Sequence, residues 1–559
     1  MNEIRKESEV LNFDILCLQE PYSRNGKISS FPITARTFSI GRHPMAAIIL
    51  FNKGITAINI AQFSDEWTNC IEIRTSIGKY ILINSYFQCR HEIHPYLIKL
   101  RQICNSFRNE HIIICADSNA KSVLWHSPQT DQRGEDLEET IMELNLEIIN
   151  KAGNPPTFRG HAGGESYIDV TLTSQNVSNI IMEWKVEDGI TVSDHNVIWF
   201  TLGSMNAVTE EQKYLQYNLK TINWQKLEET LKLPTITEGC DLDQAAQSLT
   251  DNIQRAIRKS TPQRRTTTRK TTDGFWNPQL DRLKRIARAR RKSYQRSVRP
   301  DLRATRLELY RTAKKKYEQE LHKAKVESWE KYVKENLGID VWGTPYKITM
   351  QKMKSPITLS TLVRNDGTKT TGWRESMELL MEELLPNDNV DQDTEYHTSV
   401  RTEVEEEYRT LNQSDSFTEE EVELVLNSAA KKKAPGPDGI KTEILQKLKA
   451  RIIPFLTQLF NECLRQGRFA NIWKESNMII FKKAEDRDPT IPKSYRPICL
   501  LNTIGKIYEK LLMNRLSAHR SQYGQNENQY GFRKGKSTED AVNRLIEILQ
   551  EGNSKYKIG

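Results

Sequence analysis

Apolar residues occur in the first 203 positions mainly as short β-branched runs of strand length. The run at 112–115 contains three isoleucines and a cysteine, and Ala116, Asp117, Ser118 and Asn119 follow it. Such a run predicts a strand that is buried on both faces. The strand ends in an acid and an amide, and polar groups in that position commonly face a binding or catalytic site.

Similar runs predict a domain in which strands dominate. Helical spacing is expected at 4–11, 96–108 and 137–144. Further strands are expected at 14–18, 46–51, 56–61, 70–75, 80–86, 148–150, 157–158, 168–173 and 197–202. Because many of these strands are apolar throughout, we predict stacked sheets covered by helices, as one α/β domain over residues 1–203.

The next part of the chain, residues 204–381, is predicted to be a mostly helical connector. Its central feature is a basic block at 264–334, where apolar residues recur with helical spacing on both sides of Arg299 and Pro300. That pattern predicts two long helices joined as a hairpin. Residues 382–416 are acidic and poor in apolar residues, which is typical of a linker.

Residues 417–559 again combine helices with a short strand. Thr418 and Glu421 have the spacing of a capping box at the start of a helix. Helical segments are expected at 453–466 and 503–516, with a strand at 477–482 between them. We predict a partial α+β domain here.

Charge is concentrated in the basic block. The whole chain carries +8, whereas residues 264–334 contain 23 Lys and Arg against 8 Asp and Glu. Such a block indicates a polyanionic partner, and the alternative is a solvated, charge-rich hairpin. No apolar run reaches the ~20 residues of a membrane helix, so we expect no membrane partner. The N-terminus has no signal-peptide pattern, and the eight cysteines include no C-x-x-C pair, so we expect a protein that stays inside the cell with reduced thiols.

Acidic residues and one histidine follow several of the predicted strands. Cleavage of a phosphodiester needs a metal ion to offset developing charge and a group that prepares water. Glu20, Asp117 and Asp194 are suitable candidates for Mg²⁺, which prefers carboxylate ligands. Asp169 could orient His195 and stabilise its protonated form.

Two neutral residues complete the candidate site, because Asn119 and Tyr86 could hydrogen-bond a phosphate or water. Each residue also has a purely structural explanation. Asp117 can cap a turn, His195 can be a core histidine, and Glu20 can be a solvated acid. Their joint occurrence, each at a strand end, favours a catalytic site.

The motifs at these strand ends resemble those of the endonuclease/exonuclease/phosphatase family, in particular the endonuclease domain of non-LTR retrotransposons. The matching segments are LQEP at 18–21, ADSNA at 116–120, YIDVT at 167–171 and SDH at 193–195. The resemblance implies a two-sheet α/β sandwich.

The same resemblance implies roles for the candidate residues. Glu20 would be a metal ligand, Asp117 would prepare the water, and Asn119 and Tyr86 would support the phosphate. Asp169 and His195 would form a pair, and Asp194 would lie beside them as a ligand or a supporting acid. Members of the family begin with a strand that bears an Asn near the metal. Here a predicted helix at 4–11 comes first, so we expect that strand to be missing and the chain to be a fragment.

Three later motifs resemble the start of a non-LTR reverse transcriptase. They are KAPGPDGI at 433–440, SYRPICL at 494–500 and QYGFRKG at 529–535. By this resemblance residues 417–559 form the fingers, with Lys482, Lys483 and Arg496 as phosphate contacts. The palm is expected to be absent and the polymerase inactive, since the sequence contains no Asp-Asp pair. The alternative is a turn-rich helical domain with solvated lysines.

In these elements a nucleic-acid-binding connector lies where this chain has its basic block. The expected contacts there are Arg290, Arg291, Lys292, Lys314, Lys315 and Lys316.

Together the resemblances predict a retrotransposon protein whose Mg²⁺- or Mn²⁺-dependent endonuclease nicks target DNA to prime reverse transcription. The expected partners are the DNA target, the element RNA and an element-encoded RNA-binding protein. The expected location is the nucleus, with assembly in the cytoplasm. The alternatives are a non-catalytic nucleic-acid-binding remnant and a small-phosphoester phosphatase of the same fold.

Overall fold

The structure is a computed structural model, and it describes two compact units. One unit comprises residues 1–212, 266–388 and 480–496, and the other comprises residues 213–265, 389–479 and 497–559. Within these ranges the structure describes all residues except 1–12, 29–30, 33, 161–163, 189, 191–192, 204–218, 220, 262–274, 298, 338–342, 351, 353–355, 357, 411–414, 485, 524–525, 527, 534 and 556–559. The predicted helix at 4–11 lies outside the described residues.

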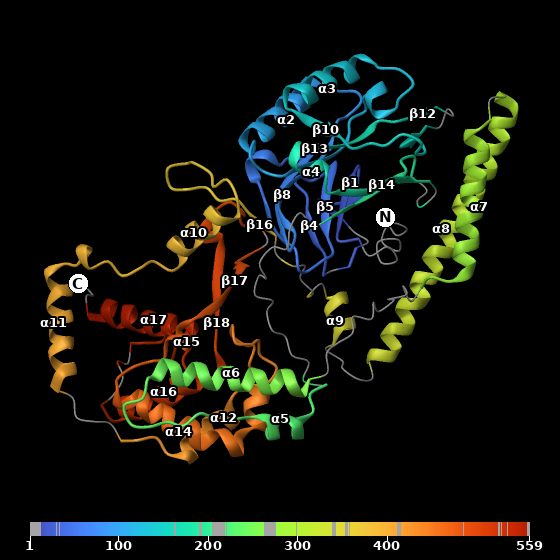
Figure 1. Cartoon of the computed structure of the whole chain (residues 1–559). Coiled ribbons are helices and arrows are strands. Elements are labelled where there is room, and N and C mark those ends of the chain that lie inside the picture. Colours follow the sequence, from blue (N-terminus) through green and yellow to red (C-terminus); the bar gives the residue numbers. More distant parts are fainter. Residues whose placement is uncertain are drawn as a thin grey trace. The chain divides into compact units, whose positions relative to one another are not determined.

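The first unit is built on two facing sheets (Figure 1). The larger sheet has seven strands, in the order β10 (Leu146–Ile148), β13 (Asp169–Ser174), β9 (Ile112–Asp117), β8 (Gly78–Tyr86), β7 (Thr68–Thr75), β6 (Thr56–Asn59) and β16 (Leu359–Ser360). The smaller sheet has the order β1 (Ile15–Gln19), β5 (Ala46–Leu50) and β4 (Arg36–Phe38). The predicted two-sheet α/β sandwich is confirmed.

Strand β9 is buried on both faces, as its sequence predicts. Ile112 and Ile114 pack with the helices α2 (His94–Ser106) and α3 (Gln132–Glu143), whereas Ile113 packs in the apolar core between the sheets. The strand pairs in parallel with β8 and antiparallel with β13. Alternation of side chains along a strand therefore lets one segment bury both of its faces.

A buried amide connects the two sheets near their polar ends. Asn84 of β8 is fully buried, and its Nδ2 donates to the carbonyl oxygens of Leu18 and Ala47 at 2.9 Å each. Its Oδ1 accepts from Nε2 of Gln19 at 2.6 Å. These bonds cross from the larger sheet to strands β1 and β5, so they fix the end of β1 relative to the end of β8.

Several strands were not predicted from the sequence. They are β2 (Ser23–Arg24), β3 (Lys27–Ile28), β4, β12 (Glu165–Ser166), β14 (Ile181–Glu187) and β16. Strand β12 pairs with β11 (Phe158–Arg159) and β14 pairs with β15 (Val197–Leu202), two strands whose positions the sequence predicts. Strand β16 pairs in parallel with β6, with Leu359 opposite Ile58. No local pattern specifies a two-residue strand that is added to a sheet from 300 positions away.

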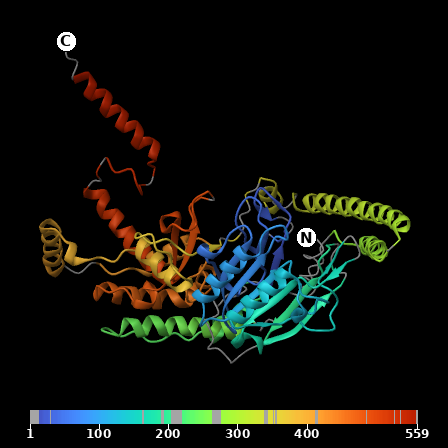
Figure 2. The same ribbon diagram turned by 90° about the horizontal axis from the view of Figure 1, so that it is seen from above.

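The basic block forms the predicted hairpin in the first unit. Helix α7 (Pro278–Gln295) and helix α8 (Pro300–Leu337) lie side by side in both views (Figures 1 and 2). Asn277 caps α7 by accepting from the backbone N–H of Leu280 at 2.9 Å. Leu280, Tyr317 and Ala324 are buried in the seam between the helices. The predicted break at Arg299 and Pro300 is confirmed.

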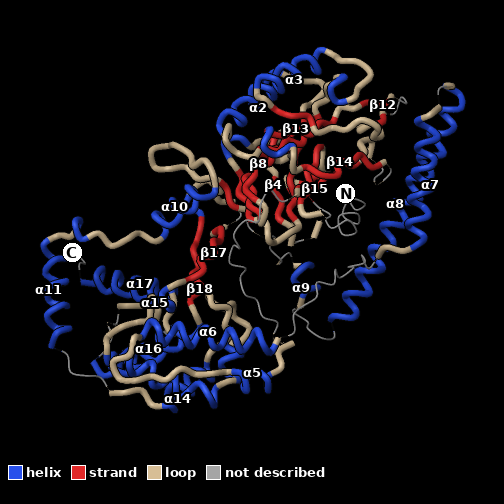
Figure 3. The backbone as a smooth tube through the Cα atoms, in the orientation of Figure 1, coloured by secondary structure: helices blue, strands red, loops and turns tan. Residues whose placement is uncertain are grey.

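The second unit is mainly helical (Figure 3). Its core gathers apolar residues of α5 (Trp224–Thr230), α6 (Leu242–Ser260), α12 (Glu419–Ser428), α13 (Thr442–Lys447), α14 (Lys449–Arg465), α15 (Asn471–Lys474) and α16 (Thr503–Tyr523). The capping box of Thr418 and Glu421 is present at the start of α12. The remaining helix after α16 is α17 (Thr538–Lys555).

The remaining elements include a helix in the predicted linker, a strand pair and two helices after the basic hairpin. The segment predicted as a linker contains helix α11 (Glu395–Thr410), which is acidic in its first turn. Strand β17 (Ser476–Lys482) pairs with β18 (Tyr495–Leu501), and α9 (Thr344–Thr349) and α10 (Trp373–Leu384) follow the basic hairpin. Among the helices that the structure describes, none has the length and apolar content to cross a bilayer.

The Asn84 amide yields a stability prediction. Asn84→Ala removes three hydrogen bonds and leaves buried carbonyl oxygens unpaired, so we expect a loss of about 2–4 kcal/mol of unfolding free energy. Thermal unfolding followed by circular dichroism checks this. The matched control is Asn105→Ala, at an exposed position of α2, which should change the melting temperature little. Equal effects of the two substitutions would contradict the connecting role of Asn84.

Candidate active site

Four strand ends deliver the candidate residues to one edge of the sandwich. Asp117 is the last residue of β9, and the ladder places it opposite Tyr86 of β8 and Asp169 of β13. Glu20 follows β1 directly, with φ +48° and its backbone N–H bonded to the carbonyl of Met45 at 2.8 Å. This left-handed backbone conformation turns the chain immediately after the strand.

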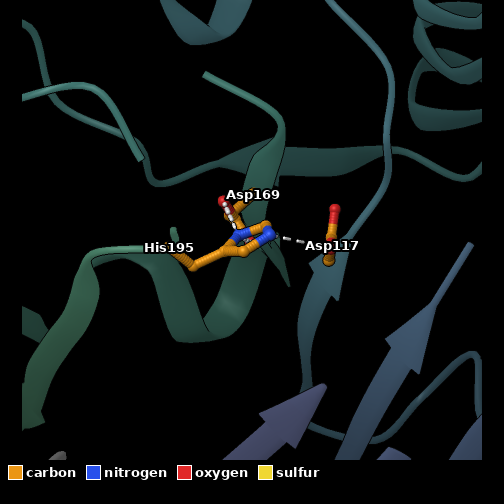
Figure 4. A group of neighbouring side chains, drawn as sticks. All are labelled: Asp117, Asp169 and His195. Atoms are coloured by element: carbon orange, nitrogen blue, oxygen red, sulfur yellow. Dashed lines mark hydrogen bonds and ion pairs between the residues drawn. The ribbon is translucent and has the colours of Figure 1, made fainter. Parts of the chain in front are cut away.

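His195 lies between two of these carboxylates (Figure 4). Its Nδ1 is 3.1 Å from both carboxylate oxygens of Asp169, and its Nε2 is 3.6 Å from Oδ2 of Asp117. The ring also packs against Phe158, with 4.8 Å between the ring centroids. The structure therefore brings the predicted pair of Asp169 and His195 together and places Asp117 on the other side of the imidazole.

The charges of this group shift the pKa values of its members. Burial, together with the nearby charge of Asp169, raises the pKa of Asp117 to about 8. Burial alone would lower the pKa of His195, but the charge and hydrogen bond of Asp169 and the charge of Asp117 outweigh it and raise the pKa to about 9. Near neutral pH the site thus holds its protons tightly, and the imidazolium is the favoured form of His195.

Tyr86 lies beside this group and under the electrostatic influence of Glu20. Its hydroxyl donates to Oε1 of Gln88 at 3.2 Å, and burial, together with the nearby acid Glu20, raises the pKa of the phenol well above its usual range. Tyr86 therefore remains a neutral donor. Its ring stacks on Trp67 at 6.1 Å, with 15° between the ring planes.

Asn119 lies on the loop after β9, also with a left-handed backbone (φ +46°). Its Nδ2 donates to the carbonyl of Phe87 at 3.1 Å, and its backbone N–H is 3.3 Å from Oδ1 of Asp117. Arg133 of α3 holds the same loop by donating to the carbonyl oxygens of Asn119 and Ser118 at 2.9 and 3.1 Å. The sequence offered no local signal for this supporting role of Arg133, because the contact depends on how α3 packs.

The group has suitable chemistry for a divalent cation. Asp117, Asp169 and His195 each offer a ligand atom, and these atoms lie within 4.8 Å of one another. Both ring nitrogens of His195 already face carboxylates, so the oxygens of Asp117 and of the neighbouring Glu20 are the better donors for a hard ion. The site can therefore hold a divalent cation through oxygen ligands.

The remaining predicted residues lie outside this ligand group. Asp194 is not part of the ligand group described above, and its carboxylate accepts from the guanidinium of Arg291. Lys482 ends β17, Lys483 bonds the carbonyl of Ser494 at 2.8 Å, and Arg496 is exposed on β18.

The cations of the hairpin also differ from one another. Arg290, Lys315 and Lys316 are exposed, and Lys314 is 3.9 Å from Glu318. Arg291 is buried against the α/β domain rather than exposed, since its partners lie on the loop before His195.

Comparison with known proteins agrees with this domain order. A family model described as endonuclease-reverse transcriptase matches residues 80–199, and a model of reverse transcriptase (RNA-dependent DNA polymerase) matches residues 480–558. The chain is 26% identical over 555 residues to a retrovirus-related Pol polyprotein from type-1 retrotransposable element R1 of Bradysia coprophila, covering 96% of this chain and 54% of the relative.

A second relative is the putative 115 kDa protein in type-1 retrotransposable element R1DM of Drosophila melanogaster, 25% identical over 97% of this chain and 53% of the relative. By these matches the chain is similar to non-LTR retrotransposon polyproteins. It spans about half the length of the curated relatives it matches.

A solved structure also matches part of this chain. The endonuclease domain of TRAS1, a telomere-specific non-LTR retrotransposon, is 28% identical and covers 37% of this chain and 92% of that chain, with a TM-score of 0.33.

The raised pKa of Asp117 predicts a pH-dependent effect on stability. A carboxyl whose folded pKa lies above its unfolded value destabilises the fold increasingly as pH rises from about 4 to about 8. In chelator, Asp117→Asn should therefore raise the unfolding free energy by about 1–3 kcal/mol at pH 8 and have little effect below pH 4. Melting curves across that pH range check this, and a destabilised Asp117→Asn protein at pH 8 would contradict it.

Proposed function

We propose that this chain is a divalent-metal-dependent endonuclease that hydrolyses a phosphodiester of target DNA. The observation that carries the proposal is the imidazole of His195 between Asp169 and Asp117, beside Tyr86 and Glu20. A surface ion pair would not explain why residues from four separate strand ends gather at one place. In the element, the 3′-hydroxyl at the nick would prime reverse transcription of the element RNA.

The geometry supports separate roles for the acidic residues and the histidine. Because the pKa of Asp117 is raised to about 8, its carboxylate is, once deprotonated, a stronger base than an ordinary aspartate, which suits a group that takes a proton from water. Asp169 holds His195 by Nδ1 and favours the imidazolium, which leaves a positive charge for phosphate oxygens. The hydroxyl of Tyr86 and the amide of Asn119 are neutral hydrogen-bonding groups at the same edge.

A divalent cation, for which we propose Mg²⁺ or Mn²⁺, would offset the negative charge that develops on the phosphate. Glu20 is the proposed ligand, with Asp194 as a further acidic residue near the site. Oxygen donors of this kind are what these hard cations prefer.

We further propose that the chain acts on nucleic acid in the nucleus after assembly in the cytoplasm, with the element RNA and an element-encoded RNA-binding protein as partners. The match of residues 480–558 to reverse transcriptases supports an RNA partner. The exposed cations of the α7–α8 hairpin support a polyanionic partner.

A nicking assay tests the catalytic proposal. The wild-type chain should convert supercoiled plasmid to open circles in Mg²⁺, and chelator should abolish the reaction. Asp117→Asn and His195→Gln should each lower kcat by about 10²–10⁴-fold, since each removes a proton-transfer or charge-stabilising group. Glu139→Gln changes an exposed acid of α3 and is the matched control, expected to match the wild type.

The same assay separates the alternatives. Plasmid binding without nicking would favour a non-catalytic nucleic-acid-binding protein. Phosphate release from a small phosphomonoester, without nicking, would favour a phosphatase.

The hairpin yields a salt-dependence prediction. Lys315 and Lys316 are exposed on α8, and each phosphate contact lowers the slope of log affinity against log salt by about 0.9. The double substitution of both lysines by Ala should therefore reduce the slope by up to about 2 for duplex DNA, between about 50 and about 200 mM salt. Fluorescence anisotropy measures this. Arg374→Ala, at an exposed position of α10, is the control, and an unchanged slope in the double variant would indicate a merely solvated hairpin.

A further inference from the structure

One face of helix α7 contacts the segment that carries His195. The guanidinium of Arg291 donates to the carbonyl oxygen of Ser193 and to the carboxylate of Asp194. Lys292 is 3.2 Å from Asp188, and Nε2 of Gln295 donates to the carbonyl of Arg159 at 3.0 Å. Within the first unit, the connector thus contacts the catalytic domain at the loop next to its histidine.

Arg291 is the most buried of these contacting cations. Its exposed fraction is 8%, and a buried guanidinium is stable only where charge and hydrogen-bond partners are supplied. Here the two donors bind one backbone oxygen and one side-chain oxygen of consecutive residues. A planar guanidinium that donates to both acceptors restrains the backbone of Ser193 as well as the side chain of Asp194. A single exposed ion pair would restrain side chains only.

The segment bound by Arg291, residues 193–194, leads directly into His195. The carbonyl of Asp194 accepts from the backbone N–H of Arg159 at 2.9 Å, and the N–H of Asn196 donates to the carbonyl of Thr157 at 2.7 Å. These bonds flank His195 on both sides. Any displacement of residues 193–194 therefore moves the backbone from which the imidazole projects.

The helix that presents Arg291 is itself held in place. Tyr294 stacks on Tyr310 of α8 at 6.5 Å, and the guanidinium of Arg303 lies 5.2 Å from the Tyr294 ring. Arg306 of α8 also donates to Oγ of Ser297 at 2.7 Å. Helix α7, which carries Arg291, is thus fixed by contacts with α8.

We propose that Arg291 is a positioning residue of the endonuclease, through which the connector hairpin holds the loop of Ser193, Asp194 and His195. The nuclease site of this chain then includes a residue from outside residues 1–203. The inference rests on the proposed function, since it assigns Arg291 a role in that reaction.

The test compares three variants of the full chain. Arg291→Ala removes the hydrogen bonds to Ser193 and Asp194. It should lower kcat for plasmid nicking by about 10–100-fold with little change in KM, because small displacements of a catalytic group have effects of that size. Arg291→Lys keeps the charge but not the planar guanidinium and should recover only part of kcat. Arg290→Ala removes an equal charge from an exposed neighbour and should instead raise KM.

Hydrogen exchange provides a readout that is independent of activity. Arg291→Ala should accelerate exchange in peptides that contain the amides of Arg159 and Asn196, with the melting temperature unchanged. If Arg291→Ala lowers the melting temperature, Arg291→Lys is used for the same comparison.

Two results would overturn the inference. One is unchanged exchange at both amides, whether or not the wild-type chain nicks DNA. The other is a nicking wild-type chain whose kcat is unchanged or increased by Arg291→Ala, an increase indicating an inhibitory contact instead. Absence of nicking in the wild type would refute the proposed function, and hydrogen exchange would then decide the positioning role alone.

Discussion

The candidate active site depends on one buried amide that joins two sheets. Asn84 uses both of its N–H donors on carbonyl oxygens of the smaller sheet and accepts from Gln19, the residue before Glu20. A sandwich held only by apolar contacts could slide, because those contacts have no direction. Directional bonds between β8 and β1 fix where Glu20 lies relative to Tyr86, and the ladder of the larger sheet then fixes Asp117.

The arrangement of charges follows from this fixed geometry. Asp117 and Asp169 lie opposite each other on neighbouring strands, and burial together with the charge of Asp169 destabilises the charged form of Asp117. The imidazolium of His195 offsets this repulsion by facing both acids. The apolar residues around Asp117, above all Ile112–Ile114, are buried. Their packing stabilises the fold and offsets the free-energy cost of the buried acidic group.

Segments far apart in the sequence complete the first unit. Residues 359–360 extend the larger sheet beside β6, and Arg291 reaches the loop of Ser193 and Asp194 from the connector. Glu72 of β7 likewise accepts from the backbone N–H of Trp373 at 3.0 Å. The α/β domain and the connector are therefore in direct contact within this unit, although their compositions differ sharply.

Features that depend on local periodicity and residue type could be predicted from the amino-acid sequence. These include the doubly buried strand β9, the helical hairpin with its break at Arg299 and Pro300, the capping box at Thr418, and the strand-end motifs from which the two-sheet fold and the retrotransposon family were inferred. Three features became evident only in the folded chain: which strand ends meet, the position of His195 between Asp169 and Asp117, and the burial of Arg291 against Asp194. The physical reason is that periodicity specifies which face of an element is buried, whereas contacts between distant segments depend on sheet order and helix packing, which no local pattern encodes.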